Sequence, residues 1–277
     1  MKTEGSFKNK DAQNIIYKAF LSGKPGAAIV FVHGLGEHSA KYDYFGERAY
    51  ERGITFFAYD QRGHGRSDGS RCHVDRFDDF VEDLRQFVEI AKAESLRDEV
   101  FIVGHSMGGL AALIFSIKYG DRIKGVIASA PVLRLVKPPC RIEAGMVKLF
   151  SRLCPRLTTP SRIPFEYLSH DKELIRETKD DKYSHRILSF RLFTEMEGGM
   201  KYALENAPAI NIPVLLLHGT GDKVTDVSGM SDFYDKVISG DKEIKLYEGL
   251  YHELLRETKR REIIDYILDW IAKRTGR

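Results

Sequence analysis

The stretch Val100-Phe101-Ile102-Val103-Gly104-His105-Ser106-Met107-Gly108-Gly109 places a serine between a run of apolar residues and an apolar segment at 110–119. The first run is typical of a buried strand and the second of a helix, so the serine lies on the turn between them. This is the G-x-S-x-G pattern of a nucleophile elbow, whose sharp turn exposes the serine hydroxyl above a sheet. Glycines two residues before and after Ser106 relieve the crowding in that turn. The N-terminus of the helix behind the serine favours an anion there.

On both sides of this motif, short apolar runs alternate with amphipathic stretches, which is typical of a parallel sheet covered by helices. Runs rich in β-branched and aromatic residues predict strands at 28–32, 55–59, 100–103, 125–129, 213–217 and, more weakly, 245–247. Apolar residues at helical spacing predict helices over 77–93, 110–119 and 263–271. The first twenty residues could add an antiparallel edge. The fold class is therefore α/β, with a mostly parallel central sheet flanked by helices.

One region, 133–205, interrupts the alternation, since it shows prolines and no convincing strand. Apolar stripes at helical spacing predict helices near 142–153 and 187–196. We interpret 133–205 as a helical insertion between two strands of a core formed by 1–132 and 206–277. Each stripe is expected to place one face on the core and to line a binding cavity. The alternative is that the stripes only pack the insertion against itself.

A serine hydroxyl is a weak nucleophile that needs a base, and the base needs an orienting acid. In this kind of fold the expected chain order is serine, acid, histidine. Asp222 follows the strand expected at 213–217, and His252 follows the one expected at 245–247. Ser106, Asp222 and His252 are therefore the predicted catalytic residues. Asp226 competes as the acid and His218 as the base, although His218 adjoins its strand and is expected to pack structurally.

Stabilising the anion formed at an attacked carbonyl requires two fixed N–H donors, an oxyanion hole. One predicted donor is the backbone N–H of Met107, the residue after the nucleophile. The other is the backbone N–H of Leu35, in the turn His33-Gly34-Leu35-Gly36 that follows the strand at 28–32. Several polar residues flank these motifs and are expected to hold loops in place by hydrogen bonds: His33, Glu37, His38, Arg62, His64 and His105.

Composition excludes several classes of protein. Of 277 residues, 43% are hydrophobic, which indicates a globular chain, and a net charge of +3 does not predict nucleic-acid binding. No apolar run is long enough to span a membrane, and the start lacks an apolar signal region, so we expect a cytoplasmic protein. Three cysteines without close spacing predict neither a zinc site nor a disulfide framework, although a single Cys140–Cys154 bridge stays open.

Three segments, followed by Asp222 and His252, resemble the monoacylglycerol lipase family of α/β-hydrolases over 29–271: His33-Gly34-Leu35-Gly36-Glu37-His38-Ser39, Asp60-Gln61-Arg62-Gly63-His64-Gly65-Arg66-Ser67 and Gly104-His105-Ser106-Met107-Gly108-Gly109. The resemblance implies an α/β-hydrolase fold and a serine hydrolase with a helical cap. It implies action on glycerol esters of one fatty acid, without a metal or an organic cofactor. By position it assigns Ser106 as nucleophile, His252 as base, Asp222 as orienting acid, and the Leu35 and Met107 amides as oxyanion donors. Residues 133–205 match the family's cap in place, so the resemblance implies that their apolar stripes line an acyl tunnel. The cap carries no motif from which substrate contacts can be transferred.

Two other functions stay open. One is a broader carboxylesterase or lysophospholipase, and the other is a ligand-binding relative that kept the fold without turnover. A lipid ester substrate also predicts transient contact with a membrane or micelle, so that the protein would be peripheral at a membrane. Exposed apolar residues of the cap and its basic residues would suit an anionic interface: Lys137, Arg141, Lys148, Arg152, Arg156 and Arg162.

Overall fold

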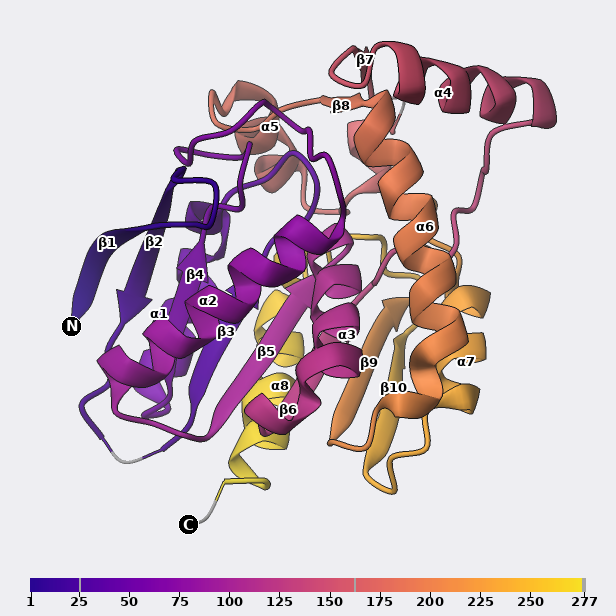
Figure 1. Ribbon diagram of the computed structural model, residues 1–277. Coiled ribbons are helices and arrows are strands. Elements are labelled where there is room, and N and C mark those ends of the chain that lie inside the picture. Colours follow the sequence, from indigo (N-terminus) through magenta and orange to yellow (C-terminus); the bar gives the residue numbers. More distant parts are fainter. Residues whose placement is uncertain (25, 162, 276–277) are drawn as a thin grey trace.

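The computed structural model describes residues 1–24, 26–161 and 163–275, and its centre is an eight-stranded sheet with helices on both faces (Figure 1). The strand order is β1-β2-β4-β3-β5-β6-β9-β10. The pairs β1–β2 and β2–β4 are antiparallel, and the remaining pairs are parallel. The strands are β1 (Lys2–Lys8), β2 (Asn14–Phe20), β3 (Ala28–Val32), β4 (Thr55–Tyr59), β5 (Val100–His105), β6 (Gly125–Ser129), β9 (Val214–Gly219) and β10 (Lys242–Tyr247).

The six strands expected from the sequence are all present, and the first twenty residues form the antiparallel edge. β10 begins at Lys242, three residues before the start that the sequence predicts. The sequence misses these residues because the first half of the strand is mainly polar and only partly buried. The strands β3 to β6 and β9 are buried at every position, as a sheet covered on both faces requires. Their uninterrupted apolar runs are the reason that the sequence predicts them well.

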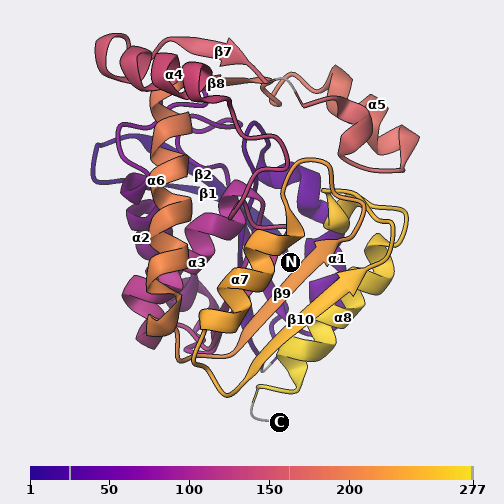
Figure 2. The same cartoon turned by 90° about the vertical axis from the view of Figure 1, so that its right-hand side faces the viewer.

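Helices cover the two faces of the sheet unequally (Figure 2). One face packs against α1 (Asp43–Glu51) and α8 (Arg260–Ala272). The other packs against α2 (Asp78–Ser95), α3 (Met107–Tyr119), α6 (Phe190–Asn206) and α7 (Val227–Lys236).

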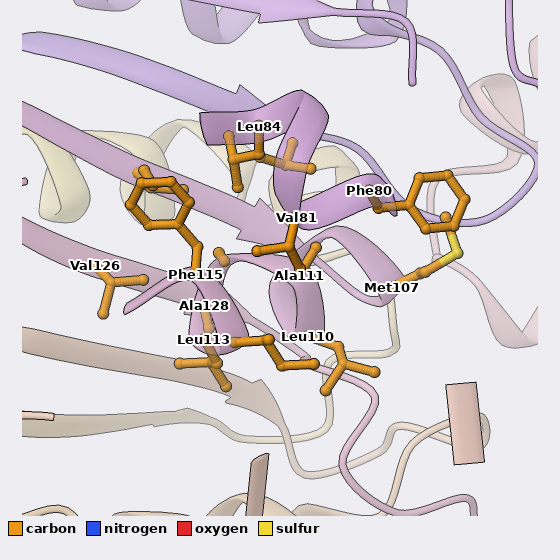
Figure 3. Packing of buried hydrophobic residues seen from close by; sticks show 14 of the residues in the cluster. Phe80, Val81, Leu84, Met107, Leu110, Ala111, Leu113, Phe115, Val126 and Ala128 are labelled. Atoms are coloured by element: carbon orange, nitrogen blue, oxygen red, sulfur yellow. The ribbon is translucent and has the colours of Figure 1, made fainter. Parts of the chain in front are cut away.

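Helix α3 is buried over its first ten residues and lies between the sheet and its neighbouring helices. Figure 3 shows side chains of α2, α3 and β6 packed in one cluster, with Phe80 and Val81 on α2, Leu110 on α3 and Val126 on β6. A helix enclosed in this way has little freedom to shift, because protein interiors are close-packed. The residue at its N-terminus, Ser106, is held in place accordingly.

The chain leaves the sheet after β6 and returns at β9, its neighbour in the sheet. Between them lie α4 (Arg141–Leu153), β7 (Thr158–Pro160), α5 (Lys172–Asp180), β8 (Ile187–Ser189) and α6. Helices α4 and α5 and the β7–β8 pair extend beyond one end of the sheet (Figures 1 and 2).

The expectation of no strand in 133–205 was wrong, because β7 and β8 pair antiparallel. Strands of three residues are too short to show an alternating pattern. Helix α4 matches the stripe at 142–153, but the second stripe divides: Ile187–Ser189 is β8, and Ser189 accepts a hydrogen bond from the Leu192 amide at the start of α6 (3.0 Å). Helix α5 was not expected, since its sequence is largely charged.

The apolar stripe of α4 does not face the core as expected. Phe150 stacks on Phe190 of α6, with ring centroids 5.2 Å apart, so α4 packs against another part of the insertion. Four other members of the stripe are exposed, at 76%, 53%, 54% and 69%: Ile142, Met146, Leu149 and Leu153. All three cysteines are free, and Cys140 and Cys154 flank α4, so the bridge between them that the sequence left open does not form.

Candidate active site

Ser106 occupies the turn between β5 and α3 with an unfavourable backbone conformation, φ 54° and ψ −117°. The conformation is held by tight packing around the turn. A Cβ at Gly104 would lie 2.3 Å from the Gly108 carbonyl oxygen, and one at Gly108 would lie 2.2 Å from that of Val32. Both positions therefore require glycine, as the elbow motif predicts. The resulting turn presents the half-buried Ser106 side chain to a cavity rather than to the core.

Three residues from three loops form a continuous chain of hydrogen bonds. His252 Nε2 lies 2.9 Å from Ser106 Oγ, and His252 Nδ1 lies 2.8 Å from Asp222 Oδ2. Asp222 follows β9 and His252 follows β10, so the carboxyl ends of neighbouring parallel strands deliver both side chains to the elbow. The structure thus brings together the three residues that the sequence predicts. With the proton on Nδ1 donated in a hydrogen bond to Asp222, Nε2 is free to accept the hydroxyl proton of the serine.

The charge on Asp222 supports this arrangement of protons. Burial raises the pKa of Asp222, but His252 and a hydrogen bond from the Val224 amide lower it by more, so the carboxylate stays ionised. Burial lowers the pKa of His252, but the Asp222 carboxylate, together with Glu253 and Glu37, raises it by more, so the net shift is upward. The imidazole is therefore prepared to hold a positive charge when it takes a proton.

The two competing residues have other partners. Asp226 accepts hydrogen bonds from the amide (2.9 Å) and hydroxyl (2.7 Å) of Ser228 and caps the N-terminus of α7. His218 is fully buried at the end of β9, where its Nδ1 lies 3.0 Å from the Gly219 carbonyl oxygen. Each therefore has a structural role that explains its position.

Thr225 contacts both Asp222 and His252, and the sequence reasoning missed it. Its hydroxyl donates to Asp222 Oδ2 (2.8 Å) and lies 3.4 Å from His252 Nδ1. Asp222 Oδ1 accepts the Thr225 amide in turn (3.1 Å). The signal was present, because a threonine three residues after an aspartate is typical of a turn closed by side-chain hydrogen bonds. This turn fixes the carboxylate that faces the histidine.

The two residues predicted to supply oxyanion donors, Leu35 and Met107, line the same cavity as Ser106. Met107 is the first residue of α3, so its amide has no acceptor within the helix. In the described part of the chain, the Leu35 amide has no hydrogen-bond acceptor either. Two N–H groups beside a serine hydroxyl are the arrangement that a tetrahedral anion requires.

Flanking polar residues hold the loop of Leu35, as expected. Glu37 Oε2 accepts the Gly34 amide and the Tyr42 hydroxyl, both at 2.9 Å. His33 Nε2 accepts the Gln61 amide at 3.0 Å. Burial raises the pKa of Glu37, but His105 and Lys41 contribute to lowering it to about 2, so it is ionised.

The remaining flanking residues also hold loops. Arg62 donates two hydrogen bonds to Asp83 on α2, at 2.6 and 2.7 Å. The Nδ1 atoms of the buried His64 and His105 lie 2.9 and 3.2 Å from the carbonyl oxygens of Arg62 and Ser129.

The cavity above Ser106 has a volume of about 200 Å³ and is lined by both the core and the insertion. Its polar lining includes Glu37, Lys41 and Asp181. Its apolar lining includes Val132, Leu135, Ile163, Phe165, Leu168 and Met196. Such a cavity can take a molecule with one apolar and one polar end. Residues 1–24, 26–161 and 163–275 hold no group of three His, Cys, Asp or Glu side chains placed to bind a metal ion.

Known proteins resemble this chain in sequence over most of its length. The family model described as serine aminopeptidase S33 matches residues 23–259. The chain is 34% identical over 91% of its length to an uncharacterized abhydrolase domain-containing protein of Dictyostelium discoideum, of whose length it spans 27%. It is 30% identical to the human monoglyceride lipase, covering 97% of this chain and 90% of that protein.

A solved structure shows that the similarity extends to the fold. A soluble variant of the monoglyceride lipase of Saccharomyces cerevisiae, in complex with a substrate analog, superposes with a TM-score of 0.87 and 25% identity. The superposition covers 99% of this chain and 96% of the other. The similarity therefore includes the segment between β6 and β9 as well as the sheet.

Proposed function

This chain belongs to the monoacylglycerol lipase family of α/β-hydrolases, and we propose that it hydrolyses monoacylglycerols to a fatty acid and glycerol. The observation that carries the proposal is the hydrogen-bonded chain from Ser106 through His252 to Asp222. Ser106 and His252 line a cavity with apolar and polar sides, which matches an ester between a fatty acid and glycerol.

The reaction proceeds by two acyl transfers. Ser106 Oγ attacks the ester carbonyl carbon while His252 Nε2 takes the hydroxyl proton, giving a tetrahedral anion. The anion collapses with cleavage of the bond to glycerol, whose oxygen receives the proton from His252. Water then attacks the acyl-enzyme, with its proton passing to His252 and then to Ser106 as the fatty acid leaves. Asp222 stays ionised throughout and stabilises the imidazolium.

The Leu35 and Met107 amides receive the negative oxygen in both tetrahedral intermediates. Charge stabilisation by one such donor is commonly worth about 3 to 4 kcal/mol of barrier. The rigid burial of α3 behind Met107 supports this role, since donors that are already oriented need no reorganisation during the reaction.

Residues 133–205 act as the cap over a core of 1–132 and 206–277. The apolar lining contributed by Ile163, Phe165, Leu168 and Met196 supports a role of the cap in binding the acyl chain. The proposed boundary between residues 205 and 206 falls within α6. The cap and the core are in contact along this helix, because Leu192 and Ala203 are both fully buried against the core.

The exposed face of α4 binds transiently to a lipid surface. Ile142, Met146, Leu149 and Leu153 are spaced by four, three and four residues, so they form one stripe along the helix. Arg141, Lys148 and Arg152 on the same helix are exposed and would suit an anionic surface. Arg162, which the sequence also suggested for this contact, lies outside the described residues. No helix in the described ranges is long and apolar enough to cross a bilayer.

Two measurements test the proposed function. A fluorophosphonate probe should label the unmodified protein, and Ser106→Ala should abolish the labelling while Ser116→Ala retains it. Hydrolysis rates on esters matched in acyl chain, with glycerol, glycerophosphocholine or ethanol as the alcohol, should favour glycerol. Faster turnover of the glycerophosphocholine ester would indicate a lysophospholipase, and equal rates would indicate a broad esterase. Absence of labelling and of turnover would indicate a ligand-binding protein.

A further inference from the structure

Residues 168–189 of the insertion, the bridging segment, contact two loops that are far apart in the sequence. The oxyanion loop, residues 33–38, carries the Leu35 amide. The histidine loop, residues 248–257, carries His252. The bridging segment contains α5 and ends in β8, and in Figure 2 α5 lies apart from α4. The bridging segment therefore contacts the two loops, whereas α4 packs on α6.

Two hydrogen bonds join the bridging segment to the oxyanion loop. The His185 amide donates to the Gly36 carbonyl oxygen at 2.8 Å. His38 Nε2 lies 2.6 Å from Asp181 Oδ2, and the Tyr183 ring meets the His38 ring edge-on at 5.9 Å. Both bonds attach within three residues of Leu35.

Asp181 connects this contact to the turn that follows α5. Its Oδ1 accepts the Tyr183 amide at 2.9 Å, and its Oδ2 also accepts the Ser184 hydroxyl at 2.7 Å. Burial raises the pKa of Asp181, but the hydrogen bonds from His38 and Ser184 contribute to lowering it to about 2. An ionised carboxylate thus orders the turn and holds His38 at the same time.

Gly36 shows how closely the two backbones approach. Its φ is +73°, and a Cβ at this position would lie 2.1 Å from the His185 carbonyl oxygen. A side chain here would therefore have to push the bridging segment away from the oxyanion loop. Leu35 is the adjacent residue, so such a displacement would reach the proposed oxyanion donor directly.

The histidine loop is held by the other end of the bridging segment. The Glu253 amide donates to the Leu168 carbonyl oxygen at 2.8 Å, directly after His252. On the other side of His252, the Tyr251 amide donates to Glu257 Oε1 at 3.2 Å. The same oxygen lies 2.7 Å from His170 Nδ1. The bridging segment therefore holds Glu253 directly and is joined to Tyr251 through Glu257.

A single residue of α5 connects the two sides. The Thr178 hydroxyl lies 3.4 Å from Lys41 Nζ and 3.1 Å from Arg256 Nη1, and both cations can donate to it. Lys41 follows the oxyanion loop, and Arg256 belongs to the histidine loop. Lys41 Nζ also lies 3.8 Å from Asp181 Oδ2. Lys41, three residues after the oxyanion loop, and Arg256, within the histidine loop, thus meet at Thr178 of α5.

From these contacts we propose that the bridging segment, through the contacts of Asp181, His185 and Leu168, positions two loops of the active site. It holds the oxyanion loop and the histidine loop in register, and Asp181 is its positioning residue. The inference rests on the proposed function, since it takes the Leu35 amide as an oxyanion donor. Such donors act only when they lie about 2.7–3.1 Å from the anion, and a displacement of about 1 Å can cost 10²-fold in rate. Loss of the contact should therefore lower kcat on any ester, including one too short to need the cap for binding.

The first test is kinetic and uses the full chain with p-nitrophenyl acetate. Asp181→Ala and His38→Ala should each lower kcat about tenfold or more while KM changes less than about twofold. The double variant should be no slower than the slower single variant, because both remove one interaction. His38→Gln retains an N–H donor and should restore most of the kcat. Asp180→Ala changes the exposed neighbour of Asp181 and should match the unmodified protein.

The second test separates positioning from folding. Affinity for a trifluoromethyl ketone, which forms the oxyanion on Ser106, should weaken in Asp181→Ala by the same factor as kcat. Gly36→Ala should lower kcat, whereas Gly23→Ala should not, since Gly23 has a similar φ of +66° and nothing within 4 Å of its Cβ position. If Asp181→Ala does not fold, Asp181→Asn keeps an acceptor for the Tyr183 amide and should show a smaller loss in kcat alone.

The outcomes distinguish this inference from the proposed function. An unmodified protein that is neither labelled by a fluorophosphonate nor active on any ester would overturn both. An active unmodified protein whose Asp181 and His38 variants keep kcat within about twofold would overturn the inference and leave the proposed function standing. A lowered melting temperature with unchanged kcat and unchanged ketone affinity would also overturn it.

Discussion

Asp222 Oδ2 lies 2.8 Å from His252 Nδ1, on the side of the imidazole opposite to Ser106. The other acid in the same loop, Asp226, instead caps α7 through Ser228. Two aspartates four residues apart thus have different partners, an imidazole for Asp222 and the N-terminus of a helix for Asp226.

This separation predicts opposite effects of substitution. Asp222→Asn should lower kcat by about 10³- to 10⁴-fold with little change in KM, because the imidazole loses its correct tautomer. Asp226→Ala should leave kcat unchanged and lower the free energy of unfolding by about 1 kcal/mol, the usual cost of a lost helix cap. Steady-state kinetics and urea denaturation check both, and the reverse pattern would move the acid role to Asp226.

The pH dependence of kcat/KM follows from the charge beside His252. The base must be neutral to accept a proton, so activity falls as the pH drops through the pKa of His252. Because Asp222 raises that pKa above its ordinary value of 6.5, the loss should begin at higher pH than for an unperturbed histidine. In Asp222→Asn the residual activity should persist to lower pH. Glu248→Gln, an exposed change in the same loop, should leave the profile unchanged, and an acid limb that Asp222→Asn does not move would contradict this assignment.

Thr225 should contribute to catalysis through Asp222. Thr225→Val retains the shape but removes the hydroxyl that donates to Asp222 Oδ2 at 2.8 Å. A hydrogen bond to a charged group is worth about 1.5 to 3 kcal/mol, so kcat should fall about tenfold or more. Thr225→Ser keeps the hydroxyl and should retain most of the activity. Equal activity of the two variants would show that the hydroxyl does not act on the carboxylate.

The sequence predicts the sheet and the triad for physical reasons that do not extend to the insertion. Strands such as β3 and β5 are buried on both faces, so their composition alone identifies them. The elbow and the two loops after β9 and β10 need particular residue types at fixed places in the fold. Helix α5, by contrast, is polar and short, and β7 and β8 have only three residues each.

Two further features escape sequence reasoning because they depend on what lies opposite. The stripe of α4 predicts an apolar face, but periodicity does not say whether another element covers it, and Leu149 is exposed. The contacts of the bridging segment use carbonyl oxygens of Gly36 and Leu168, and backbone acceptors leave no residue-type signature.

The exposed stripe of α4 predicts a difference between soluble and interfacial substrates. Ile142→Glu and Leu149→Glu should raise the apparent KM for a monoacylglycerol in anionic phosphatidylglycerol vesicles about tenfold, because each removes apolar area from the contact. Neither should change kcat on p-nitrophenyl acetate. Ile238→Glu provides a matched control, since Ile238 is 65% exposed but follows α7 and lies outside the insertion. Equal effects of all three variants on vesicle kinetics would exclude α4 as the contact.

The backbone conformation of Ser106 predicts that the catalytic serine reduces stability. A residue other than glycine at φ 54° and ψ −117° costs about 1–3 kcal/mol, and glycine tolerates positive φ without that cost. Ser106→Gly should therefore raise the free energy of unfolding by about 1 kcal/mol over Ser106→Ala, although both are inactive. Ser116→Gly, in the last turn of α3, should instead destabilise the protein by about 1 kcal/mol, because it adds backbone freedom within a helix. Urea denaturation of the three variants measures the difference, and a Ser106→Gly variant less stable than Ser106→Ala would show that the elbow is not strained.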